Sequence, residues 1–310
     1  MDVRYVLSRL LQGLAVIVTV IVIVFVVLRV AGDPVDILLP ITASEEARDN
    51  LRHQLGLDRP LLTQFGDFAT DVVRLDFGDS YRRHSPALPI VLGRFGKTVE
   101  LVGVSIALAA LTGVLAGAVA AMRPNGLVDR LTTFLAMVSV SVPQFWLGLV
   151  VILIFAVGLG LLPSSGSGGV RNLILPAVTM AIPPAGRFAA VTRSVMSDEL
   201  GQEYIRMDRS RGLPRWRVLR HALRGTTVTL VSVIGYETVN SLAGHSIVVE
   251  TVFAWPGIGR LVTESLAQQD LPLIQAVVGF IALLVVCMNL VLDIVYSWID
   301  PRISRGEDTS

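Results

Sequence analysis

Long apolar runs separated by polar segments dominate the sequence. Six runs reach the length of about 20 residues that an α-helix needs to cross a bilayer. They cover residues 7–30, 98–122, 132–162, 174–196, 226–249 and 273–299. Because only a helix satisfies its own backbone hydrogen bonds in lipid without closing into a barrel, the pattern predicts an all-α membrane protein with about six transmembrane helices.

Prolines interrupt two of these runs. Pro143 lies in the third run, and Pro176, Pro183 and Pro184 lie in the fourth. Proline removes a backbone donor and clashes with the preceding turn, so we expect kinks at both places. A kink either opens a cavity or accommodates packing.

The polar segment at residues 31–97 predicts a small helical cap. Ser44 is suited to cap a helix whose first turn is acidic, and Gly56 is suited to end it. Pro60 restarts the chain, and apolar residues then recur at helical spacing as far as Phe77. We expect two short amphipathic helices lying against the ends of the spans.

A dense basic segment at residues 197–225 separates the fourth and fifth runs. Ser197 is expected to cap a helix that continues to about Arg211, where Gly212 ends it in a left-handed turn. Pro214 suits the start of a second helix.

In that second helix, Trp216, Leu219 and Leu223 fall at helical spacing on one face. A solvated loop is the simpler interpretation of the charge. The apolar ridge and the rigid Gly-Leu-Pro corner favour a protruding elbow that a partner grips.

Composition and charge agree with a membrane protein. Only 16% of the 310 residues are charged, against about a quarter in soluble domains. The single cysteine, Cys287, excludes an intrachain disulfide. The first run is longer than a signal-peptide core and lacks a cleavage pattern before Asp33, so we expect it to remain as an anchor.

Arginines fix the expected orientation. They concentrate before the first run, between the second and third, in the basic segment and after the last run. Both termini are therefore expected in the cytoplasm. In the 31–97 segment acidic residues outnumber basic ones, and we place it outside.

Polar residues within the spans are candidates for a translocation path. Arg187 lies in the fourth run, and Glu237, Asn240 and His245 lie in the fifth. Charge in lipid costs at least a few kcal/mol, so these side chains should face other helices or water. Hydrogen bonding between helices is an equally good interpretation.

The outer segment at residues 253–272 is a candidate docking platform for a binding protein. It begins with a turn at Trp255-Pro256-Gly257, and an amphipathic helix containing Arg260 follows.

No catalytic, metal-binding or nucleic-acid-binding motif is found. The chain has no G-x-x-x-x-G-K-[ST], H-E-x-x-H or G-x-S-x-G. An intramembrane hydrolase is therefore a poor interpretation. A proton-coupled secondary transporter could use Glu237 and Arg187 as a relay, but no internal repeat is evident.

The stretch YIRMDRSRGLPRWRVLRHALR resembles the coupling motif, or EAA loop, of ABC importer permeases of the dipeptide, oligopeptide and nickel transport family. AGDPVD, LDFGDS, VSVPQFWLGL, VVETVFAWPGIGRLV and DPRIS follow the family in the same order, so the resemblance covers nearly the whole chain. Asp208 and Ser210 depart from it, since they replace small apolar residues that would pack into an ATPase groove. Thr229 stands in the place of a proline.

The resemblance implies a type I ABC importer permease fold in a bacterial cytoplasmic membrane. The implied partners are a second permease subunit, two cytoplasmic ATPases that carry the ATP and Mg, and an extracytoplasmic substrate-binding protein or lipoprotein. This chain is then a non-catalytic subunit that binds no cofactor itself. The implied substrates are peptides, with nickel, haem and glutathione as alternatives.

The resemblance also assigns ATPase coupling to residues 203–222. The positions expected to contribute are Glu203, Tyr204, Arg206, Asp208, Arg209, Gly212, Leu213, Pro214, Trp216, Leu219 and Leu223. The expected organisation is a first helix at 1–30, the cap at 31–97, the permease core at 98–299 and a tail at 300–310.

Overall fold

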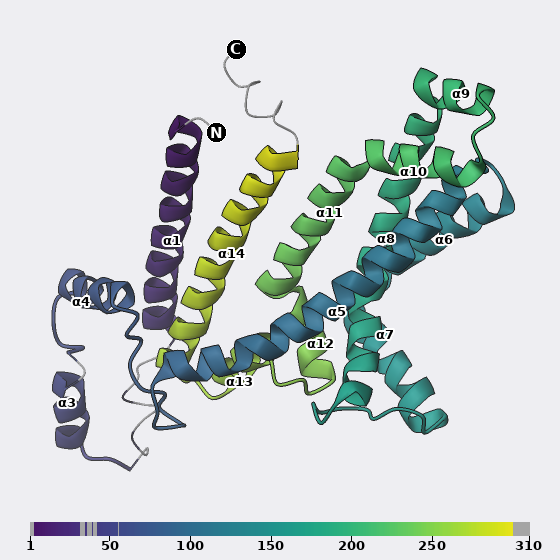
Figure 1. Cartoon of the computed structure of the whole chain (residues 1–310). Helices are drawn as coiled ribbons and strands as arrows, with labels where there is room; N and C mark the ends of the chain where they lie inside the picture. Colours follow the sequence, from purple (N-terminus) through teal and green to yellow (C-terminus); the bar gives the residue numbers. More distant parts are fainter. Residues whose placement is uncertain (1–2, 32–34, 36–38, 40–41, 55, 300–310) are drawn as a thin grey trace. The chain divides into compact units, whose positions relative to one another are not determined.

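The computed structural model describes residues 3–31, 35, 39, 42–54 and 56–299. These described residues form two compact units, one within Asp2–Gly96 and Gly257–Cys287, the other within Lys97–Pro256 and Met288–Ser310. The regular structure of the described residues consists of helices, apart from one isolated β-bridge between Asp79 and Pro86. The predicted all-α class is confirmed (Figure 1).

The first unit contains the predicted cap helices. α3 (Glu45–Gln54) begins after Ser44, whose Oγ accepts a hydrogen bond from the Ala47 amide at 3.2 Å. Gly56 follows with φ +65°. Both predicted ends of this helix are confirmed.

The second cap helix packs against the first long helix. α4 (Leu61–Val73) starts directly after Pro60, as predicted. The ring of Phe25, in α1 (Val3–Ala31), lies 5.3 Å from the ring of Phe65 and 5.7 Å from that of Phe68. α4 ends four residues before Phe77, earlier than the apolar spacing predicts, because Leu75 turns the chain with φ +60°.

The same unit is completed by α13 (Ile258–Ala267) and the first part of α14 (Leu271–Ile299). Ile258 and Leu261 of α13 pack with Val91, near the start of α5 (Ala87–Ala121). Gly13 brings α1 close to α14, because a Cβ there would lie 2.7 Å from Val286 Cγ1. The amphipathic helix predicted within residues 253–272 is therefore present.

The second unit is organised around α8 (Val170–Leu200). The rest of α5 packs on it, since a Cβ on Gly113 or Gly117 would run into the carbonyl oxygen of Ala185 or Ala189. Small residues at such crossings allow helices to approach closely. Pro176, Pro183 and Pro184 lie inside α8, which continues through all of them.

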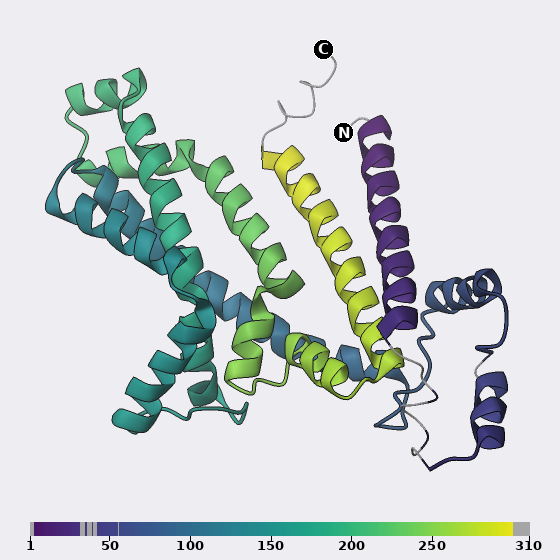
Figure 2. The same cartoon turned by 180° about the vertical axis from the view of Figure 1, so that it is seen from behind.

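The break at Pro143 is sharper than a kink. α6 (Leu127–Ser141) ends there, and α7 (Gln144–Val151) continues at an angle of 103° into a π-helix, Ile152–Gly158. Figure 2 shows this bend from behind. The third predicted run is thus a bent pair of helices.

The predicted spans agree with the structure in part. By length and composition α5, α8 and α14 qualify as spans among the described residues, and the bent pair makes a fourth if counted as one. The first run lies in α1. Its part Leu11–Val26 is an apolar helix that is shorter than the candidate spans. The fifth run is divided into α11 (Thr227–Asn240), a π-helix (Ser241–His245) and α12 (Ser246–Val252).

Candidate functional site

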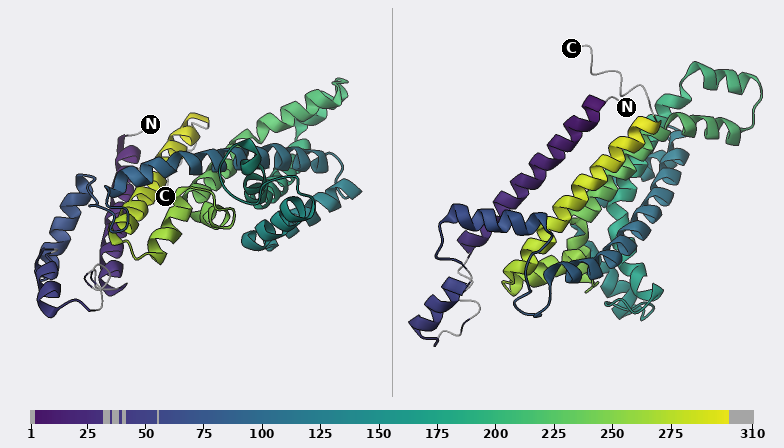
Figure 3. Two further views of the ribbon diagram at one scale, coloured as in Figure 1. Left: turned by 90° about the horizontal axis from the view of Figure 1, so that it is seen from below. Right: turned by 60° about the vertical axis from the view of Figure 1, so that its left-hand side comes forward.

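The basic segment folds as two short helices beyond the end of α8. α9 (Glu203–Ser210) and α10 (Arg215–Gly225) are joined by a turn in which Gly212 adopts φ +72° (Figure 3). Pro214 directly precedes the first residue of α10. The predicted corner is confirmed, and we call α9, the turn and α10 the elbow.

The predicted start of the elbow is wrong. Ser197 does not cap a helix but lies inside α8, and its buried hydroxyl makes no hydrogen bond within the described residues. Burial of the neighbouring Met196 in an apolar cluster keeps this turn helical. α8 ends at Leu200, and α9 begins after Gln202.

Asp208 faces the inside of the elbow. Its side chain is buried, and Oδ2 lies 2.7 Å from Nδ1 of His221 in α10. The carboxylate therefore joins the two helices of the elbow. The part of Asp208 in ATPase coupling stays a prediction.

The apolar ridge of α10 is divided between core and surface. Leu219 and Leu223 are half-buried and pack with Leu213 on a cluster around Ile205. Trp216 is 59% exposed. Two further large side chains on α9 are exposed, Tyr204 and Met207, and the second was not singled out from the sequence.

The remaining predicted coupling positions are at the surface. Exposed residues on α9 and the turn are Glu203, Arg206, Arg209, Gly212 and Pro214. The Tyr204 hydroxyl donates a hydrogen bond to Glu199, at the end of α8. Partial burial and the neighbouring Glu199 carboxylate raise the pKa of Tyr204 to about 12.

Three of the four candidate path residues meet between α8 and α11. Arg187 donates from Nε to Glu237 Oε2 at 2.8 Å and from Nη2 to Oε1 at 2.5 Å. His245 Nδ1 lies 3.8 Å from Glu237 Oε1. Asn240 is half-buried one turn beyond Glu237 and joins none of these contacts. We call Arg187, Glu237 and His245 the charge cluster.

The candidate docking residues are divided between core and surface. Trp255 is 1% exposed, and its Nε1 donates to the Lys97 carbonyl oxygen at 2.8 Å, so its side chain is a core residue. Pro256 is half-buried, and Gly257 is buried. Arg260 is half-buried, with Nε 2.7 Å from Glu264 Oε1 within α13.

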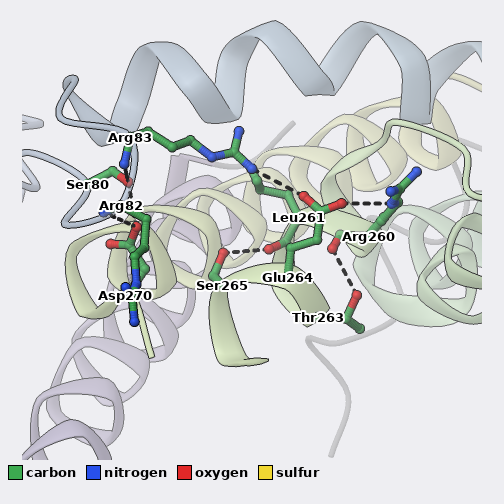
Figure 4. Close-up of polar contacts among 9 residues, drawn as sticks. All are labelled: Ser80, Arg82, Arg83, Arg260, Leu261, Thr263, Glu264, Ser265 and Asp270. Atoms are coloured by element: carbon green, nitrogen blue, oxygen red, sulfur yellow. Dashed lines mark hydrogen bonds and ion pairs between the residues drawn. The ribbon is translucent and has the colours of Figure 1, made fainter. Parts of the chain in front are cut away.

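Polar contacts around α13 fix the loop that precedes α5 (Figure 4). Glu264 also pairs with Arg83 Nη2 at 3.1 Å. Asp270 is fully buried, accepts from the Ser80 hydroxyl and accepts from the Tyr81 amide at 3.1 Å. Because these partners lie almost 200 positions apart, the sequence did not indicate them.

Comparison with known proteins identifies the family. The chain matches the family "Binding-protein-dependent transport system inner membrane component" over residues 113–305, and the N-terminal region of such components over residues 2–102. It belongs to this family.

Relatives of the permease align along almost its whole length. A Brucella abortus protein named as a peptide transport system permease is 34% identical over 308 residues, 96% of this chain and 98% of that protein. The glutathione transport system permease GsiC of Salmonella typhimurium is 38% identical over 302 residues, 97% of this chain and 98% of GsiC. GsiC of Escherichia coli K12 is 36% identical over the same length.

The family and the apolar helices make the chain a multi-pass component of the cytoplasmic membrane, a permease subunit of an ABC importer with the type I fold. No group of three or more metal-ligating side chains occurs in the described part of the permease. A further ion pair escaped the sequence analysis, that of Arg193 with the buried Asp129, whose carboxylate accepts from Nε at 2.7 Å and from Nη2 at 2.8 Å. It joins α8 to the first turn of α6.

Proposed function

We propose that this permease moves peptides inward across the cytoplasmic membrane, driven by ATP that partner subunits bind and hydrolyse with Mg. The elbow carries the proposal, because it presents Tyr204, Met207 and Trp216 on two rigidly joined helices next to α8. An exposed aromatic on a rigid support is typical of an interface hot spot. Motion of an attached ATPase would pass through α8 to the spans.

The proposed assembly contains a second permease subunit, two ATPases, and a binding protein or lipoprotein on the outer side. Both termini lie in the cytoplasm, as the arginine distribution predicts. The half-buried Pro256 and Arg260 of the outer segment would receive the binding protein, with Trp255 as internal support.

The test of the elbow is Trp216→Asp in the complete importer, reconstituted in liposomes. Loss of a central aromatic anchor typically weakens association by at least about tenfold. We therefore expect ATPase association and ATP-driven uptake to fall together. Trp216→Phe should retain both.

Leu62→Asp is the matched control, because Leu62 is an exposed apolar residue of the cap, at 86% exposure. It should leave ATPase association unchanged. Full association of the Trp216→Asp permease would show that the elbow is not the contact.

The substrate is tested by uptake of a dipeptide, glutathione, haem and nickel into the same liposomes with the cognate binding protein. The relatives named for peptide and glutathione transport favour the first two. Vanadate should abolish uptake and a protonophore should not. The reverse result would favour a proton-coupled carrier.

A further inference from the structure

The charge cluster leaves one edge of an arginine available. Glu237 takes one N–H of Arg187 Nε and one of Nη2, and a guanidinium also carries two N–H groups on Nη1 and a second on Nη2. None of these three has a hydrogen-bond partner among the described residues. The Arg187 side chain is 35% exposed, whereas that of Glu237 is 4% exposed. The carboxylate of Glu237 is therefore covered, and the free edge of the Arg187 guanidinium is accessible.

His245 extends the accessible side of the cluster. Its side chain is 58% exposed. In an uninterrupted α-helix, residues 237 and 245 would lie about 80° apart around the axis, because eight residues turn the helix by about 800°. The π-helix Ser241–His245 takes up one additional residue and brings the imidazole back to the side of Glu237. π-Turns of this kind are frequent at functional sites.

We propose that Arg187 and His245 form a binding site for a substrate carboxylate, with Glu237 as a positioning residue. The proposal rests on the proposed transport function and specifies the substrate class. A guanidinium edge matches the two oxygens of a carboxylate. Glu237 fixes the plane of that guanidinium by holding its other edge.

The chemistry favours an anionic group over a metal cation. The only carboxylate of the cluster is buried and already bound by Arg187. No group of three or more His, Cys, Asp or Glu residues that could hold a metal occurs in the described ranges. Peptides, glutathione and haem all carry carboxylates, whereas nickel does not.

The site is tested by protection of a nearby thiol. Gly244 adjoins His245, and no described atom lies within 4 Å of the position of a Cβ on it. A Gly244→Cys permease in a Cys287→Ser background therefore offers one accessible thiol. Alanyl-alanine should slow its reaction with a maleimide, and the C-terminal amide of the same dipeptide should require a higher concentration.

A hydrogen bond between charged groups is worth about 1.5–3 kcal/mol, so the protecting concentration of the acid should rise about tenfold or more when Arg187 is replaced by Gln. The double variant Arg187→Gln, Glu237→Gln leaves no unpaired buried charge. It should lose the preference for the acid to the same extent as Arg187→Gln alone. Arg187→Lys should retain part of it. Equal protection by acid and amide in the unmodified cluster, or a preference for the acid that survives in both Gln variants, would overturn the site.

Labelling requires no transport and so separates the two proposals. Protection by alanyl-alanine without its ATP-driven uptake would contradict dipeptide transport and support the carboxylate site. Uptake without protection would support dipeptide transport and contradict the site.

Discussion

Two buried carboxylates, Glu237 in α11 and Asp208 in α9, each join a pair of helices, but in different surroundings. Glu237 lies in the fifth predicted run and is held by a guanidinium, which stays charged at any physiological pH. Asp208 lies in the elbow and is held by His221, an imidazole that can donate a hydrogen bond without carrying a charge. The first pair needs two charges, whereas the second needs only a donor and an acceptor.

The largest effect is expected from Arg187→Ala. Removing Arg187 leaves the buried Glu237 carboxylate as an uncompensated charge, which costs about 3–5 kcal/mol. The thermal unfolding temperature of the permease in detergent should fall accordingly. Arg187→Gln with Glu237→Gln should recover most of the loss. If the single and double variants were equally unstable, compensation of charge would not be the role of the pair.

A smaller effect is expected from Asp208→Ala. An unsatisfied or lost hydrogen bond at a partly buried site costs about 1–3 kcal/mol. The elbow should loosen, so that limited proteolysis between α9 and α10 becomes faster. Asp208→Asn retains an acceptor for the imidazole and should behave like the original chain. Rapid cleavage of the Asn variant would mean that this pair also depends on charge.

The smallest effect is expected from Tyr204, whose hydroxyl lies at the surface. Tyr204→Phe removes one hydrogen bond, to Glu199, worth about 1 kcal/mol. Because the folded protein holds the pKa of Tyr204 at about 12, above the ordinary value of 10.0, the protonated phenol is favoured. Its contribution is complete below pH 10 and is lost as the pH rises through 12.

Difference absorbance of the phenolate, recorded against the Tyr204→Phe permease, measures this titration. Ionisation near pH 10 would show that neither partial burial nor Glu199 raises the pKa of the phenol. The elbow would then depend on the Asp208–His221 contact more than on its surface hydrogen bonds.

Local signals in the sequence predicted local structure well. Ser44, Gly56, Pro60 and Gly212 each end or start a helix as expected, because the cause lies within a few residues. Ser197 failed because packing of its neighbour Met196 overrides the capping preference.

Long-range contacts were only partly predictable. Polar residues within apolar runs singled out Arg187, Glu237 and His245. Their pairing depends on how α8 packs against α11, because Arg187 and Glu237 are 50 positions apart in the sequence. Asp208 was interpreted from its place in a motif, and the sequence did not indicate its contact with His221.

The prolines of α8 weaken the helix at one place along its length. Pro183 and Pro184 lack the amide hydrogens that would bind the preceding turn, whereas the stretch from there to Leu200 contains no proline. We therefore expect α8 to bend most easily at these prolines, about 6 Å from Arg187 and about 26 Å from Leu200 at about 1.5 Å per residue. If Leu200, at the elbow end of α8, moved by about 4 Å, Arg187 would move by about 1 Å. That shift is enough to break a hydrogen bond while the helix stays intact.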